Sequence, residues 1–258
     1  MELNMKQFQI EEIKNKIIEG DALEILPRIP DNSVDLILTD PPYGISNETR
    51  ITRTKNTMKF KATTDLISNF GSWDKFENIH QFMEFTYRWV QLAIPKLRPG
   101  GMFISYFDRD KINFLSQFLQ KSGFKSKGYF AHIKSNPVPQ ARKVKWMNAW
   151  EIVGMWQKSG GKLTYNYQLG QHPDYMIVPI VGGKERLNHP TQKPLKIAKL
   201  FISYWTNKGD LVLDPFCGVG TFPLACKQLG RNFIGIEKDP KYVEIARMRI
   251  RTQASPLL

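Results

Sequence analysis

The chain has little cysteine and little histidine: two Cys and four His among 258 residues. Two cysteines, Cys217 and Cys226, do not make a disulfide framework, so we expect a reducing, cytoplasmic setting. His172 and His189 have no Cys or carboxylate at metal-binding spacing, so we expect no metal. No apolar run approaches the roughly 18 residues of a membrane span, and the first residues lack a signal-peptide pattern.

Acidic residues are also scarce relative to basic ones. The 37 Lys and Arg outnumber the 24 Asp and Glu, which gives a formal net charge of +13 and a pI near 9.6. This balance is typical of proteins that bind nucleic acid, although a basic protein of another kind can share it. The length suits one domain with insertions, and an apolar content of 41% suffices for a core.

One segment has a rigid geometry that suggests chemistry. The apolar run 34–39 predicts a buried strand, and Asp40-Pro41-Pro42-Tyr43 follows it. Proline fixes its own φ, lacks an N–H and pushes the preceding residue to extended backbone. The turn therefore offers fixed acceptors beside an aromatic ring, which suits a flat ring that carries an amino group. The structural alternative is a proline-rich turn with no chemical role.

A second segment predicts a nucleoside site. A strand at 210–213 leads into Asp214-Pro215-Phe216-Cys217-Gly218-Val219-Gly220-Thr221 and then a helix. The glycines allow close backbone approach to a ligand, although the third glycine of the dinucleotide fingerprint is missing. The next strand, 231–236, ends at Glu237, which is placed to accept hydrogen bonds from ribose hydroxyls. Together these features indicate a cofactor that contains a nucleoside.

With these two motifs in this order, the chain resembles the amino-group DNA methyltransferases that use S-adenosylmethionine, in their circularly permuted β class. In that family Asp-Pro-Pro-Tyr comes first and the Asp-Pro-Phe-x-Gly-x-Gly-Thr motif near the end. Two further family blocks stand in the expected order, 134–139 (Lys-Ser-Asn-Pro-Val-Pro) and 189–194 (His-Pro-Thr-Gln-Lys-Pro). The resemblance spans roughly residues 17–250.

The resemblance implies an α/β, Rossmann-like methyltransferase fold. We expect a mixed seven-stranded sheet with helices on both faces, in which the strand ending at Asp21 lies next to the strand ending at Glu237 and closes the permuted order. Residues 1–258 then form a single methyltransferase domain: a catalytic half at 17–157 with a basic loop at 44–73, a candidate target-recognition insertion at 158–188, and a cofactor-binding half at 189–251. Residues 1–16 are expected to form a surface arm.

The resemblance also assigns the site residues. The catalytic group is Asp40, Pro41, Pro42 and Tyr43, with the tyrosine stacked on a flipped base. The expected cofactor-binding residues are Asp21, Ala22, His189, Thr191, Lys193, Asp214, Pro215, Phe216, Gly218, Gly220, Thr221 and Glu237. Asp21 would accept a hydrogen bond from the adenine amino group of the cofactor, but with Glu24 it also fits a helix N-cap. The block at 189–194 would hold the methionine end of the cofactor, or be only a loop and a helix cap.

Two segments are candidates for contacts with double-stranded DNA: the basic loop at 44–73 and the stretch at 136–146. The residues expected to contact DNA are Arg50, Arg53, Lys55, Asn136, Pro137, Arg142, Lys143 and Lys145. The alternative for both segments is a solvated surface loop. A cognate restriction endonuclease and a homodimer are further partners that the resemblance leaves open.

The function expected from the resemblance is site-specific transfer of a methyl group to the exocyclic N6 of a flipped-out adenine. In this family, Asp at the first motif position usually accompanies adenine. Cytosine N4 presents similar chemistry and remains an alternative, followed by an amino group of RNA or protein, or a non-catalytic DNA-binding module. Cytosine C5 is disfavoured because its chemistry needs a Pro-Cys nucleophile, whereas Cys217 lies in the cofactor turn.

Overall fold

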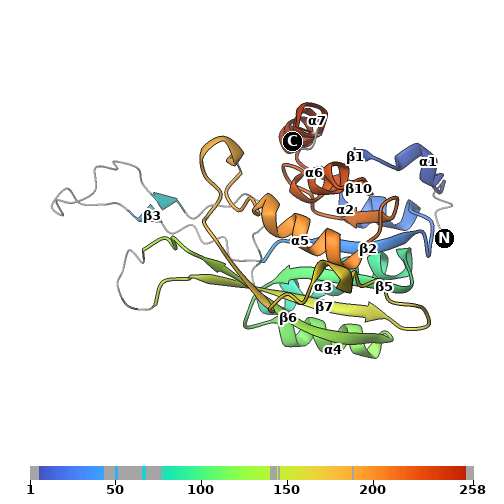
Figure 1. Ribbon diagram of the computed structural model, residues 1–258, viewed down its shortest axis with the longest axis horizontal. Helices are drawn as coiled ribbons and strands as arrows, with labels where there is room; N and C mark the ends of the chain where they lie inside the picture. Colours follow the sequence, from blue (N-terminus) through green and yellow to red (C-terminus); the bar gives the residue numbers. More distant parts are fainter. Residues whose placement is uncertain are drawn as a thin grey trace.

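The computed structural model describes residues 6–43, 50–51, 66–67, 76, 78–139, 144, 146–187 and 189–253. An eight-stranded sheet runs through it, flanked by helices (Figure 1). The strand order is β1 (Lys16–Glu19), β10 (Asn232–Glu237), β9 (Leu211–Asp214), β2 (Val34–Thr39), β5 (Leu97–Phe107), β7 (Trp150–Lys158), β6 (Phe124–Lys134) and β8 (Tyr175–Val178). A separate short hairpin pairs β3 (Arg50–Ile51) with β4 (Leu66–Ile67).

The direction of each strand determines which residues lie together at each edge of the sheet. The strands β1, β10, β9, β2 and β5 are parallel to one another, and β7 is antiparallel to both β5 and β6. Of the eight strands, β7 therefore runs against the other seven. Its first residues lie at the edge where the other strands end, which is the edge where open α/β sheets bind ligands.

Helices cover both faces of the sheet and create two cores. One face carries α2 (Ala22–Ile25), α3 (Ile79–Ala93) and α4 (Ile112–Lys121), and the other carries α5 (Leu195–Trp205), α6 (Thr221–Gln228) and α7 (Pro240–Thr252) (Figure 1). Within β2, Ile37 belongs to the first core, and Leu36 and Leu38 belong to the second. Successive side chains on a strand point to opposite faces, so a strand covered on both sides is apolar at nearly every position.

The expected α/β class and the permuted closure are confirmed. The first strand of the sheet, β1, pairs in parallel with β10, and Glu19 lies opposite Glu237. The chain thus completes the sheet between its N-terminal and C-terminal parts.

The expected strand count was one too low. The eighth strand, β8, lies within 158–188 and pairs in parallel with β6. It is short and at the edge, with Tyr175 and Ile177 exposed and Val178 buried, so the apolar pattern that marks an inner strand is absent. The segment expected to form a surface arm, 1–16, also contributes to the core. Ile13 in α1 (Ile10–Ile13) is buried, and Phe8 packs against the core.

Gly220 lies where α6 packs against α7, so a substitution at this position tests that packing. Its φ is +77°, and a Cβ there would lie 3.0 Å from the Cβ of Ala246. Gly220→Ala should therefore incur about 1–2 kcal/mol of left-handed strain and about 1–3 kcal/mol of overpacking. The matched control is Gly209→Ala, because Gly209 has φ +88° with no heavy atom within 4 Å and should show only the strain.

Urea-induced unfolding measures both variants, and Gly220→Ala should have the lower unfolding midpoint. Equal midpoints would contradict close packing at Gly220.

Candidate active site

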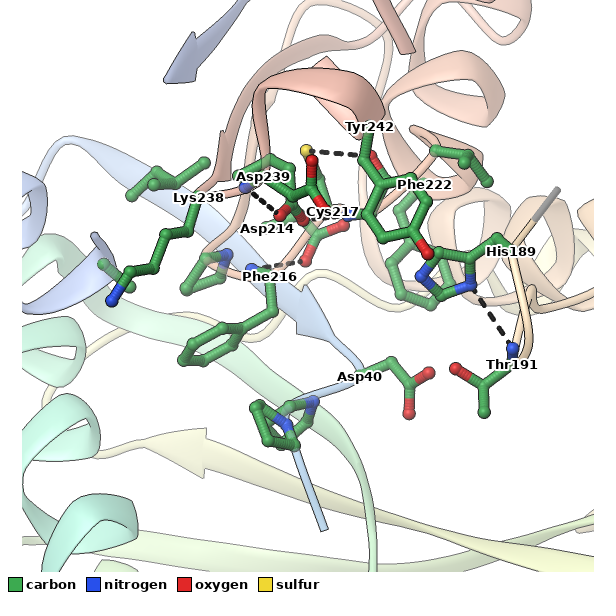
Figure 2. Close-up of a pocket in the computed structure, with 18 of the residues that line it drawn as sticks. Asp40, His189, Thr191, Asp214, Phe216, Cys217, Phe222, Lys238, Asp239 and Tyr242 are labelled. Atoms are coloured by element: carbon green, nitrogen blue, oxygen red, sulfur yellow. Dashed lines mark hydrogen bonds between the residues drawn. The ribbon is translucent and has the colours of Figure 1, made fainter. Parts of the chain in front are cut away.

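A cavity of about 430 Å³ opens at the carboxyl ends of β2, β9 and β10, beside the loop that precedes α5 (Figure 2). Both sequence motifs line it. The expected site residues that line the cavity are Asp21, Ala22, Asp40, Pro41, Pro42, Tyr43, His189, Thr191, Lys193, Asp214, Pro215, Phe216, Gly218, Thr221 and Glu237. Sequence reasoning missed Phe85, Phe222, Asp239 and Tyr242, which also line it.

Two residues of the glycine motif have packing roles. Gly220 is not among the lining residues and instead lies close to Ala246 in α7. The Cys217 side chain is buried, and burial raises the pKa of its thiol well above the usual value, as do the charges of Asp214 and Glu237. A thiol that stays protonated is a poor nucleophile, so Cys217 does not suit the nucleophilic role that cytosine C5 chemistry needs.

The Glu237 carboxylate is fixed by backbone donors on both of its oxygens. Oε2 accepts the N–H of Gly218 at 2.9 Å, and Oε1 accepts the N–H of Asp239 at 2.8 Å. Each carboxylate oxygen can accept a second hydrogen bond. The carboxylate can therefore also accept hydrogen bonds from a diol such as ribose while its orientation stays fixed.

Asp21 serves the helix cap that its sequence context predicted. Its Oδ1 accepts the N–H of Leu23 at 2.9 Å at the start of α2. Its Oδ2 accepts from Lys238 at 2.8 Å, and the lysine is largely exposed. Because Asp21 also lines the cavity, the cap holds a carboxylate at the cavity wall.

Asp214 lines the cavity, and no described residue donates a hydrogen bond to one of its two carboxylate oxygens. Its Oδ1 accepts from the Thr39 hydroxyl at 2.9 Å and from the Phe216 N–H at 3.2 Å. Its Oδ2 is buried and has no hydrogen-bond partner among the described residues. Burial raises the pKa of Asp214 well above its usual value. A buried oxygen of this kind fits a ligand that brings a hydrogen-bond donor, such as the ammonium group of S-adenosylmethionine.

His189 presents a neutral ring to the same cavity. Burial, together with the charge of Lys193, lowers the pKa of His189 to about 4. Its Nδ1 lies 3.3 Å from the Thr191 N–H and accepts from it, and its ring packs edge-on against Tyr242 at 4.7 Å. A Cβ on Gly218 would lie 3.2 Å from the His189 Nε2, so a glycine there lets the ring approach the turn.

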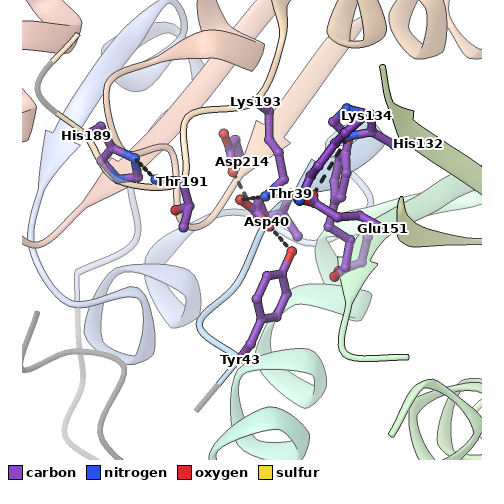
Figure 3. Close-up of polar contacts among 12 residues, drawn as sticks. Thr39, Asp40, Tyr43, His132, Lys134, Glu151, His189, Thr191, Lys193 and Asp214 are labelled. Carbon is purple, nitrogen blue, oxygen red and sulfur yellow. Dashed lines mark hydrogen bonds and ion pairs between the residues drawn. The ribbon is translucent and has the colours of Figure 1, made fainter. Parts of the chain in front are cut away.

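The Asp40–Tyr43 turn is tied to a partly buried chain of alternating charges (Figure 3). Asp40 Oδ2 lies 2.6 Å from the Lys193 ammonium, and Asp40 Oδ1 accepts from the Tyr43 hydroxyl. The same ammonium lies 3.3 Å from Glu151 Oε2, and Glu151 Oε1 lies 2.6 Å from Lys134. The order of charges is therefore carboxylate, ammonium, carboxylate, ammonium.

The protonation states along this chain follow from its neighbours. Burial alone would raise the pKa of Glu151, but Lys193 and Lys134 lower it to about 2. Burial lowers the pKa of His132 to about 4, so this ring, 3.7 Å from Glu151, is neutral near pH 7. Glu151 is therefore ionised at neutral pH, and His132 adds no charge beside it.

Sequence reasoning missed Glu151, and it assigned Lys193 to the cofactor. Glu151 is the second residue of β7, whose antiparallel direction brings it to the edge of the sheet where Asp40 lies. The apolar residues that follow Glu151 are visible in the sequence, but the direction of their strand is not. Lys193 lines the cavity, and its ion pairs are with Asp40 and Glu151.

The residues expected to contact DNA are only partly described. Asn136 Oδ1 accepts the N–H of Ile180 at 2.7 Å, so this side chain holds the end of β6 to the segment after β8. Neither Asn136 nor Pro137 lines the cavity. Arg50 lies in β3 with its side chain outside the described part, and the other expected residues outside it are Arg53, Lys55, Arg142, Lys143 and Lys145. Trp146, in the β6–β7 connection, is 94% exposed.

The part of the chain that the structure describes has no candidate metal cluster and no candidate membrane-spanning helix. The described residues contain no cluster of three or more His, Cys, Asp or Glu side chains able to hold a metal ion. None of their helices has the length and apolar character needed to cross a membrane.

Comparisons with known proteins agree with the site. A family model described as DNA methylase matches residues 34–176 and 177–248. The type II methyltransferase M2.MboI of Moraxella bovis is 31% identical over 97% of this chain and 92% of its own length. The type II methyltransferase M.HinfI of Haemophilus influenzae is 31% identical over 96% of this chain and 71% of its own length.

Solved structures show the same fold. The M1.HpyAVI–SAM complex superposes with a TM-score of 0.69 at 28% identity, over 91% of this chain and 98% of that one. The PvuII DNA methyltransferase, described as cytosine-N4-specific, superposes with a TM-score of 0.70 at 20% identity, over 90% of this chain and 85% of that one, and shares the fold. With both motifs facing one cavity, this chain belongs to the DNA methylase family and is an S-adenosylmethionine-dependent amino-group DNA methyltransferase.

Proposed function

We propose that the protein methylates the exocyclic N6 of an adenine that is flipped out of a specific double-stranded DNA sequence. The observation that carries the proposal is the Asp40 carboxylate, which opens onto the same cavity as Glu237 and the Gly218 turn. The residue that would accept the target amino group and the residues that would bind the cofactor nucleoside therefore line the same cavity.

The chemistry required of the turn follows from the target nitrogen. The lone pair of an exocyclic amino group is delocalised into the ring, so this nitrogen is a poor nucleophile. The Asp40 carboxylate and the Pro41 carbonyl accept its two hydrogens and favour a pyramidal nitrogen with its lone pair directed into the cavity. When bound, S-adenosylmethionine supplies an electrophilic methyl group and leaves as S-adenosylhomocysteine. Asp40 is then placed to receive the proton that the amino nitrogen releases.

Positioning supplies much of the acceleration. Two reactants held in line avoid a large entropic cost. Extrusion of the base from the duplex costs a few kcal/mol. A stack on Tyr43, worth about 1–3 kcal/mol, would offset part of that cost.

The cofactor would lie between β9, β10 and the loop before α5. Glu237 would accept the ribose hydroxyls, Asp21 the adenine amino group, and Asp214 Oδ2 the methionine ammonium. The neutral His189 ring and Thr191 would close the methionine end. The support is that these side chains line one cavity and that Asp214 Oδ2 has no partner among the described residues.

Adenine is preferred because Asp stands at the first motif position, which accompanies adenine in the family that the chain resembles. Cytosine N4 is the second candidate, because its amino group needs the same acceptors. The type II names of the relatives support a cognate restriction endonuclease as partner. A homodimer rests on the resemblance alone.

We assign sequence recognition to residues 158–188 and phosphate contacts to the basic segments around Arg53 and Lys143. Exposed tyrosines support the first assignment, since Tyr167 is 63% exposed in the turn at 167–169 and Tyr175 is 45% exposed in β8. The net charge of +13 supports the second.

Asp40→Ala should abolish methyl transfer, with a loss of at least about 10²-fold, because the target nitrogen loses its main acceptor. The assay is incubation with tritiated S-adenosylmethionine and unmethylated genomic DNA, followed by nucleoside analysis. The control is Asp110→Ala, at an exposed aspartate in the turn after β5. The wild type should yield N6-methyladenine; N4-methylcytosine would favour the second candidate, and unlabelled DNA with intact cofactor binding would refute the proposal.

Glu237→Ala should raise the Kd for S-adenosylmethionine roughly 10- to 100-fold, because hydrogen bonds to a charged group contribute about 1.5–3 kcal/mol. Isothermal titration calorimetry measures this. Glu244→Ala is the matched control, at an exposed glutamate of α7. An unchanged Kd in Glu237→Ala would argue against the ribose contact.

A further inference from the structure

The Lys193 ammonium is unusually buried for a lysine. The residue is 6% exposed, and its Nζ lies 2.6 Å from Asp40 Oδ2 and 3.3 Å from Glu151 Oε2. It also lies over the Tyr106 ring, 4.7 Å from the ring centre. A buried charge is costly unless it is paired, and here the pairing partner is the catalytic carboxylate itself.

The two oxygens of Asp40 have different partners. Lys193 holds Oδ2, whereas Oδ1 accepts from the Tyr43 hydroxyl. The hydroxyl therefore occupies the acceptor that the target amino group needs. When Tyr43 turns its ring toward a flipped base, its hydroxyl can leave Oδ1 while Lys193 keeps the carboxylate in place.

The groups around Asp40 shift its pKa in opposite directions. Burial raises the pKa of Asp40, Lys193 lowers it, and Glu151 raises it again. Tyr43 faces Asp40 from its own turn, and Asp214 faces it from the end of β9. Lys193 is the cation in contact with Asp40 among the described residues.

We propose that Lys193 is a positioning residue for methyl transfer: it fixes Asp40 Oδ2 and keeps the carboxylate anionic, so that Oδ1 faces the target amino nitrogen. Glu151, itself paired with Lys134, holds the ammonium in place from the opposite side. The inference rests on the proposed function, since it assigns a role in that same reaction.

A role in holding the cofactor is the competing assignment for Lys193. That role predicts a weaker affinity for S-adenosylmethionine and an unchanged pH dependence of the chemical step. A role on Asp40 predicts unchanged cofactor affinity and a shifted pH dependence, so the two can be separated.

The test uses single-turnover methyl transfer at saturating DNA and S-adenosylmethionine, measured across pH for the wild type, Lys193→Met and Glu151→Gln. Lys193→Met should lower the rate on the order of 10²-fold, as expected when a reacting group is misplaced. Its acid limb should move to higher pH, because the pKa of Asp40 rises when the cation is lost. Glu151→Gln should move the acid limb to lower pH, because an anion near Asp40 is removed.

Lys96→Met is the matched control. Lys96 is also 6% exposed and forms an ion pair with Asp31 at 2.7 Å, but it precedes β5 at the opposite edge of the sheet. This variant should keep the wild-type rate and pH profile even if its melting temperature falls. Calorimetric titration with S-adenosylmethionine reports on folding and cofactor affinity in every variant.

Shifts in opposite directions for the two variants, with cofactor affinity unchanged, would support the inference. A wild-type pH profile in Lys193→Met, or a loss of cofactor affinity without a shift, would overturn it while leaving the proposed function intact. If Lys193→Met fails to fold, Lys193→Gln is measured in its place, with the same upward shift of the acid limb expected. A wild-type protein that methylates no DNA would overturn both proposals.

Discussion

The parallel pairing of β2 with β9 is the constraint on which the site depends. Leu36 lies opposite Val212, and Ile37 lies opposite Leu213, so the two strands end side by side. At that end the Thr39 hydroxyl donates to Asp214 at 2.9 Å and joins segments 175 positions apart. The Asp40–Tyr43 turn and the glycine turn follow directly, and they face one cavity because their strands are neighbours.

The second constraint on the site is electrostatic: Asp40 must stay ionised. A carboxylate that accepts amino hydrogens must remain charged in a site that excludes water, and burial alone raises the pKa of Asp40. Lys193 opposes that effect, and Glu151, itself paired with Lys134, contacts the Lys193 ammonium as a second carboxylate. The antiparallel direction of β7 brings Glu151 into this chain, so the topology and the electrostatics of the site are linked.

Much of the site could be predicted from the sequence because its residues follow strands in recognisable local patterns. Asp40, Asp214 and Glu237 each stand at or just beyond the end of an apolar run, and they all line the cavity. Glu151 could not be placed, because its position depends on the direction of β7 relative to its neighbours. The packing role of Gly220 depends on Ala246 in another helix, which no local pattern reveals.

The fold shows the same division between local and long-range information. Inner strands were predicted because burial on both faces makes them apolar throughout, whereas β8 was missed because it is short and half exposed. The permuted closure was predicted because the order of motifs left one strand position to fill, and β1 fills it.

The central claim is that Asp40 binds the target amino group while Lys193 holds its other oxygen. A crystal structure of the protein with S-adenosylhomocysteine and cognate DNA tests it most directly. The account predicts a flipped adenine whose N6 lies within about 2.7–3.2 Å of Asp40 Oδ1, with the Lys193 ammonium still on Oδ2. A flipped base whose amino group contacts other residues, with Asp40 turned away from it, would contradict the account.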